Sequence, residues 1–205
     1  MKMKIAIAAA AIAALFAAGS GRAAEVVVQV RSVEDPASPA DPAVCAQAPF
    51  HVNLRLGGSL YTYRTRYSDG SVSGEPRKVG RATACVLLTS FLFPPGLAQN
   101  FYARFELPQG AFTAVGTCTF ISNEVPRVGL VIAGCNLKLV GFPDDYLGGA
   151  VTSLSTFNPF RLVGFNTGSY YTFQLYDHAA PDSGQGDSEH AMEWVEDPPS
   201  QEVRR

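Results

Sequence analysis

Four polar side chains could do chemistry because each lies within an otherwise strand-like stretch of sequence: Arg104, Glu106, Asn136 and Tyr102. Alternate residues of a strand point to the same face, so Arg104 and Glu106 share one. If that face lined the inside of a barrel, the pair could bind a carboxylate or a carbonyl group. The simpler interpretation places both residues on the outer face in water, since charged side chains are rarely buried.

The other two side chains of this set suggest ligand contacts rather than a reaction. Tyr102 is one of several strand tyrosines that could stack on a flat or sugar-like ligand, although such residues also simply pack. Asn136 would add a hydrogen-bonding group within an apolar strand. The chain has no Gly-x-Ser-x-Gly, His-Glu-x-x-His, phosphate-binding or calcium-binding motif, so we assign no catalytic residue and predict no cofactor.

The cysteines indicate disulfides rather than a metal site. Cys45, Cys85, Cys118 and Cys135 are even in number, and the chain has neither a Cys-x-x-Cys pair nor clustered histidines, so no metal is predicted. A hairpin centred near residues 126–127 would place Cys118 opposite Cys135, with β-carbons about 4.5–5.5 Å apart, close to disulfide reach. The predicted pairs are Cys118–Cys135 and, by elimination, Cys45–Cys85. The alternative is two free cysteines in the core.

The elements that must carry these residues are strands, because apolar and polar residues alternate with a period of two. The expected strands cover residues 50–56, 61–67, 81–92, 101–107, 112–121, 130–140, 151–157 and 169–176. Turn residues such as Asp69-Gly70 separate them, and no helical period of useful length interrupts them. The sequence therefore predicts an all-β fold, a single antiparallel closed barrel of about eight strands, with a sandwich as the alternative.

The two ends of the chain differ in composition from this body. Residues 1–24 combine lysines, an Ala-rich apolar run and small residues, which predicts a signal peptide rather than a membrane anchor. Residues 25–48 are expected to be an extended N-terminal segment, residues 49–177 the barrel domain, and residues 178–205 a disordered acidic tail. The protein is accordingly expected to be exported, to the periplasm or the medium.

The charge distribution excludes one class of partner. Residues 25–176 contain ten acidic and eleven basic side chains, whereas the remaining C-terminal residues contain eight acids and two arginines. A nearly neutral body has no basic field to hold a phosphate backbone, so nucleic acid is not an expected partner. No segment after residue 24 is apolar enough to predict a membrane span.

From residue 105 to residue 177, the order of short motifs resembles the eight-stranded barrel of the allene oxide cyclase and dirigent family. The motifs are Leu107-Pro-Gln-Gly110, Val115-Gly116, Val131-Ile-Ala-Gly134, Gly141, Tyr146-Leu-Gly-Gly149, Val151-Thr-Ser153 and the strand from Tyr170 to Tyr176. The chain departs from the family at Ala133-Gly134-Cys135-Asn136, where the family carries Gly-Gly-Thr-Gly. It also lacks an Ala-Arg-Gly element, which Leu147-Gly148-Gly149 replaces. The resemblance covers about a third of the chain and implies a closed barrel.

This sequence supports three hypotheses about function. The leading one is a barrel that binds a small apolar molecule without catalysis, because eight strands leave room for side chains or one small ligand. The second is an isomerase or cyclase acting on an unsaturated or phenolic substrate, as the resemblance implies. An inward carboxyl or arginine side chain would favour that enzyme, and an outward-facing Arg104 and Glu106 would count against it. The third is a structural or interaction module that uses its outer surface and acidic tail.

Overall fold

The computed structural model describes residues 25–63 and 74–178 of the 205-residue chain. The predicted signal peptide, residues 179–205 of the predicted tail, and part of the expected strand over 61–67 lie outside the described residues. All the described strands belong to one barrel.

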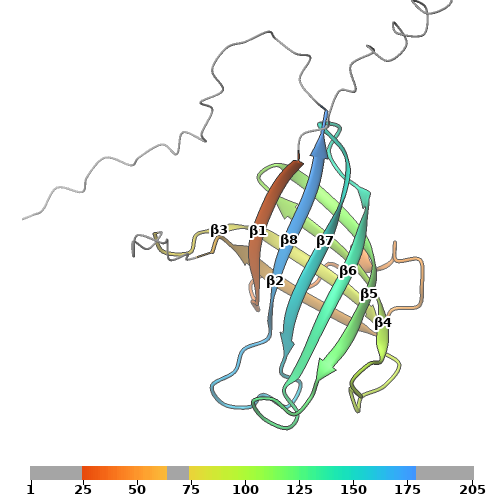
Figure 1. Ribbon diagram of the computed structural model, residues 1–205, viewed down its shortest axis with the longest axis vertical. Helices are drawn as coiled ribbons and strands as arrows, with labels where there is room; N and C mark the ends of the chain where they lie inside the picture. Colours follow the sequence, from red (N-terminus) through yellow and green to blue (C-terminus); the bar gives the residue numbers. More distant parts are fainter. Residues whose placement is uncertain (1–24, 64–73, 179–205) are drawn as a thin grey trace, which may run out of the picture. The chain divides into compact units, whose positions relative to one another are not determined.

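The fold is a closed antiparallel barrel of eight strands, as the sequence predicts (Figure 1). The strands are β1 (Glu25–Glu34), β2 (Leu54–Tyr61), β3 (Lys78–Leu87), β4 (Ala98–Leu107), β5 (Gly110–Ser122), β6 (Val131–Gly141), β7 (Tyr146–Phe157) and β8 (Gly168–Asp177). Each strand pairs with the next, and β1 closes the barrel by pairing with β8 from Glu25 opposite Tyr176 to Val33 opposite Gly168. Closure removes the free edges that would otherwise expose unpaired backbone groups.

The barrel begins earlier in the chain than the sequence predicts. Residues 25–34 do not belong to an extended segment outside the barrel, because they form β1. Val26, Val28 and Val30 face the core, while Gln29 points outward. The alternation is hard to detect in the sequence because Val27, on the outer face, is also apolar. In addition, the partner of β1 along most of its length lies at the other end of the barrel sequence.

Residues 35–53, which we call the strap, connect β1 to β2 and pack on the outside of the barrel. The strap contains one helical turn, α2 (Pro42–Cys45), whose first turn is capped by the Asp41 carboxyl group accepting from the Ala43 N–H at 2.8 Å. Val44, Cys45, Cys85 and Tyr102 form a buried apolar cluster between the strap and the barrel wall. Gly57 lets the strap approach, because a β-carbon there would collide with the backbone of residues 38–40.

Both predicted disulfides are present. Cys45 in the strap joins Cys85 on β3, and Cys118 on β5 joins Cys135 directly opposite on β6. The two bonds lie on different sides of the barrel wall: Cys85 belongs to the cluster under the strap, while Cys118 and Cys135 belong to the interior core. The described residues contain no free cysteine.

Fully buried aromatic side chains fill the interior at the end of the barrel where β2, β4, β6 and β8 finish. Phe105, Phe112 and Phe173 are fully buried there, and the rings of Phe105 and Phe112 pack edge-to-face on Phe173 with centroids 5.0 Å and 5.8 Å away. Leu60 and Leu175 fill the remaining space. We call this the packed end and the opposite one, where β1, β3, β5 and β7 finish, the loop end.

Candidate functional site

A cavity of about 100 Å³ occupies the interior at the loop end. Its apolar wall comes from β2 to β7 and from the loop after β3, and includes Leu54, Leu56, Ala84, Phe101, Phe120, Val131 and Phe157. It exists because the inward positions of β1, β7 and β8 at this end carry small hydroxyl side chains, Ser32, Ser155 and Ser169, where β8 carries Phe173 at the packed end. An apolar cavity of about 150 Å³ binds benzene, so a cavity of about 100 Å³ with an open mouth encloses at most about one ring of a ligand.

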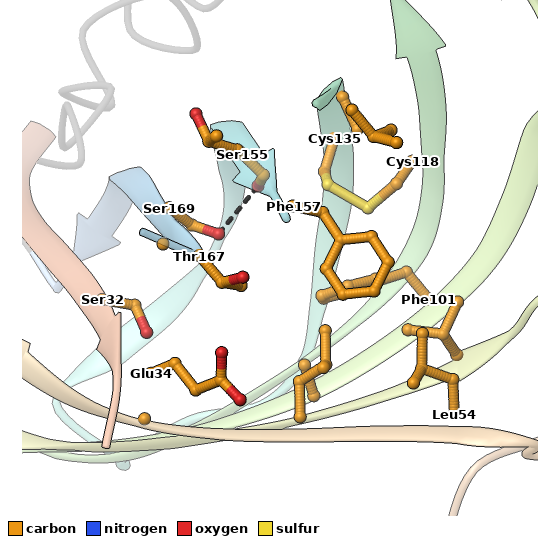
Figure 2. A pocket seen from close by; sticks show the side chains of 18 of the residues that line it. Ser32, Glu34, Leu54, Phe101, Cys118, Cys135, Ser155, Phe157, Thr167 and Ser169 are labelled. Atoms are coloured by element: carbon orange, nitrogen blue, oxygen red, sulfur yellow. Dashed lines mark hydrogen bonds between the residues drawn. A yellow bond between two sulfur atoms is a disulfide. The ribbon is translucent and has the colours of Figure 1, made fainter. Parts of the chain in front are cut away.

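The opposite wall of the cavity is polar. Ser32 and Glu34 from β1, Ser155 from β7, and Thr167 and Ser169 at the start of β8 line it, and Figure 2 shows them facing Phe157, Phe101 and Leu54 across the opening. The Ser169 hydroxyl donates to Ser155 at 2.8 Å, and Ser155 lies 3.3 Å from Ser153. The site thus offers a hydrogen-bonding wall on one side and an apolar wall on the other.

Glu34 is the ionisable side chain of this wall, and it is exposed to solvent. It lies at the mouth, and among the described residues no basic side chain comes within salt-bridge distance of its carboxyl group. A wider and shallower hollow of about 500 Å³ adjoins the mouth, shares Glu34 and Thr167, and is also lined by Arg161. A ligand in the cavity could therefore place a polar group at Glu34 and still be in contact with water.

Tyr171 marks the floor of the cavity. Its ring packs edge-to-face on Phe105, with the centroids 4.8 Å apart, and its side chain is fully buried. Burial raises the pKa of Tyr171 above its usual value near 10, and a hydrogen bond with Ser169 opposes the shift. The floor therefore presents a neutral phenol at physiological pH.

The four site residues predicted from the sequence all lie outside the barrel interior. Arg104 and Glu106 share the outer face of β4, where Glu106 accepts from Arg81 at 3.1 Å and lies 3.8 Å from Arg104. The Arg81 hydrogen bond lowers the pKa of the Glu106 carboxyl group. Asn136 is exposed on β6, and Tyr102 is buried beneath the strap. None of the four lines the cavity, and their role in binding a ligand stays a prediction.

Sequence reasoning missed the polar wall. Ser155 and Ser169 alternate with outward residues as the strand period requires, but small hydroxyl residues carry no signal that separates an inward face from an outward one. Glu34 was hidden for a different reason, because the strand that carries it was not predicted. The signal that could have revealed the site is that Ser155 and Ser169 continue the apolar alternation of Val151 and Phe173, at positions where a filled barrel would need larger side chains.

Within residues 25–63 and 74–178, no helix is both long enough and apolar enough to cross a membrane. No family model, no curated protein and no solved structure matches the chain. The resemblance to the allene oxide cyclase and dirigent family therefore stays a prediction, and a function has to be inferred from the geometry of the barrel.

Proposed function

We propose that the barrel binds a small, largely apolar molecule in the cavity at its loop end. The observation that carries this proposal is the cavity itself, which has an apolar wall, a hydroxyl wall and an opening to solvent. Pockets of this kind bind by burying apolar surface and use a few polar groups to fix orientation. Because the volume is about 100 Å³, the buried part of the ligand is about the size of one ring, and a longer molecule would project through the mouth.

Titration calorimetry with toluene and benzyl alcohol tests this proposal on the wild type and on an Ala84→Leu variant. Ala84 lines the cavity, so the added carbons occupy the space the ligand needs, and affinity should fall about tenfold or more. Ala98→Leu adds the same atoms at an exposed position of β4 and should leave affinity unchanged. If neither probe binds the wild type, or if both variants bind equally well, the cavity is not the binding site.

A second candidate function is an isomerase or cyclase, and Glu34 is the observation that favours it. A carboxyl group at the edge of an apolar cavity can act as a general base if it contacts the reacting atoms. The outward positions of Arg104 and Glu106 count against the version of this idea that relies on them. Isomerisation of 3-cyclohexenone to its conjugated isomer, followed by NMR, would support the enzyme if Glu34→Gln abolished it. Equal rates with both proteins would exclude catalysis by Glu34.

A further inference from the structure

Each loop that follows β3, β5 and β7 exposes two large apolar side chains. We call these six residues the apolar rim: Phe91 and Leu92 in loop 88–97, Val125 and Val128 in loop 123–130, and Phe160 and Val163 in loop 158–167. Val163 is 97% exposed, Leu92 82% and Val128 80%, so these side chains lie almost wholly in water. Single exposed apolar residues are ordinary, but a group of them at one end of a molecule marks an interaction surface.

The loops hold these side chains outward by fixed contacts. Phe93 has a φ of 48° and turns inward, where its ring packs on Phe120 and Phe157 with centroids 5.4 Å and 5.7 Å away. This anchor leaves Phe91 and Leu92 at the tip of their loop. In loop 158–167 the anchor is polar. The buried side-chain amide of Asn158 donates to the carbonyl oxygens of Leu162 and Phe165 and accepts from the N–H of Leu162, at 2.8–3.0 Å.

The three loops also join into one surface. Asn123 Nδ2 donates to the carbonyl oxygen of Leu92 at 3.1 Å, which ties the first loop to the second. The ring of Phe160 lies so close to Gly129 that a β-carbon there would collide with it, which ties the second loop to the third. Figure 1 shows all three at the same end of the barrel. Phe93, Val131 and Thr167, which lie in these loops or directly after them, line the cavity. The apolar rim therefore lies beside the mouth of the cavity.

From this arrangement we propose that the apolar rim docks the barrel on a lipid bilayer, with the mouth of the cavity facing the membrane. The three loops carry only three charged side chains, Glu124, Arg127 and Arg161, and the mouth adds Glu34, so few charges come close to the membrane when the rim inserts. The two arginines lie beside the apolar tips, where they can pair with lipid phosphates. An apolar molecule dissolved in the membrane then reaches the cavity without crossing water.

A lipid surface fits the rim better than a folded partner does. The apolar side chains project from three separate loop tips, and a protein partner would need a complementary hollow for each of them. A bilayer accepts projecting side chains without such complementarity, because its acyl region rearranges around them. A second copy of the chain is the competing occupant, and the oligomeric state without lipid distinguishes the two.

Flotation with lipid vesicles tests the inference directly. The barrel closes within residues 25–178, so the oxidised chain is tested from Glu25 to Arg205, which removes the apolar segment 5–21 that would bind vesicles on its own. Vesicles are made of phosphatidylcholine, with and without phosphatidylglycerol. The rim variant replaces the more exposed apolar-rim residue of each loop, as Leu92→Ser, Val128→Ser and Val163→Ser. The matched control replaces equally apolar wall residues that are 52–55% exposed, as Val27→Ser, Val140→Ser and Leu154→Ser.

We expect the wild type and the wall variant to float with both kinds of vesicle, and the rim variant to lose about tenfold or more in partitioning. Equal loss in both variants, binding by the rim variant as strong as that of the wild type, or no binding by the wild type would overturn the inference. Sedimentation velocity without lipid tests the competing occupant. If the wild type is a dimer that does not bind vesicles, and the rim variant is a monomer, the rim is an interface with a second copy of the chain. The flotation experiment contains no ligand for the cavity, so a failure to bind vesicles would not count against the proposed ligand binding.

Discussion

At the scale of single residues, Asp35 fastens the start of the strap to the barrel wall. Its carboxyl group accepts a hydrogen bond from the hydroxyl of the buried Ser59 on β2 at 2.5 Å and another from the N–H of Ala37 at 2.9 Å. Lys78 lies 3.7 Å away. These contacts favour the ionised form, with the Ser59 bond as the largest cause, and they lower the pKa of Asp35 below 3.8.

Stability should therefore depend on the ionisation of Asp35 in acid. A carboxyl group with a lowered pKa in the folded state stabilises the fold above its unfolded pKa, and the contribution disappears as the pH falls through the folded pKa. We expect Asp35→Asn to flatten the decline in unfolding free energy below about pH 4. Urea unfolding across this pH range measures it, with Asp144→Asn in the exposed turn between β6 and β7 as the control. An unchanged acid profile for Asp35→Asn would contradict the assignment.

The sequence predicted the orientation of a side chain, inward or outward, only where a pattern of alternation determined it. The alternation in β5 and β6 places Cys118 and Cys135 on facing inward positions, so their disulfide could be predicted and is confirmed. The polar cavity wall could not be predicted, because Ser155 and Ser169 give no signal of direction. Arg104 and Glu106 share the outer face of β4, as the simpler interpretation of the alternation predicts.

At the scale of elements, the two disulfides constrain different lengths of chain. Cys45–Cys85 links residues 40 positions apart and holds the strap on the wall, whereas Cys118–Cys135 links residues 17 apart across one hairpin. The entropy removed from the unfolded chain grows with the length of the closed loop, which gives about 4 kcal/mol for the longer and about 3 kcal/mol for the shorter.

Replacing each cysteine pair by alanine should reproduce that order. We expect Cys45→Ala with Cys85→Ala to lower the free energy of unfolding by more than Cys118→Ala with Cys135→Ala. Guanidinium unfolding of the two double variants and the wild type provides the comparison. A larger loss for the Cys118–Cys135 variant would show that packing inside the barrel outweighs chain entropy at this site.

The strands from β3 onward could be predicted because local alternation defines them, but β1 could not, and β2 (Leu54–Tyr61) runs between the two strands expected over 50–56 and 61–67. β1 pairs with β8 along most of its length, and this contact spans nearly the whole described chain. Two of its outward positions, Val27 and Val33, are apolar, so the alternation is blurred. The strap shows the same limit, since its proline-rich composition predicts an extended segment but not the surface on which it packs.

At the scale of the whole molecule, the proposed ligand binding depends on a difference between the two ends of the barrel. Aromatic side chains such as Phe105, Phe112 and Phe173 fill the packed end, while the small side chains of Ser32, Ser155 and Ser169 on one wall leave a cavity at the loop end. Alternation predicts closure of the sheet but not which end is hollow, because this depends on how the residues of eight strands meet at the same level.

Diffraction from a crystal held under xenon tests the hollow end most directly, because xenon enters apolar cavities and scatters strongly. We predict a xenon atom inside the barrel at the loop end, bounded by Ala84, Phe101 and Tyr171, with none at the packed end. Side chains that fill the barrel at this level, with no xenon bound among them, would contradict a hollow loop end and the ligand binding that depends on it.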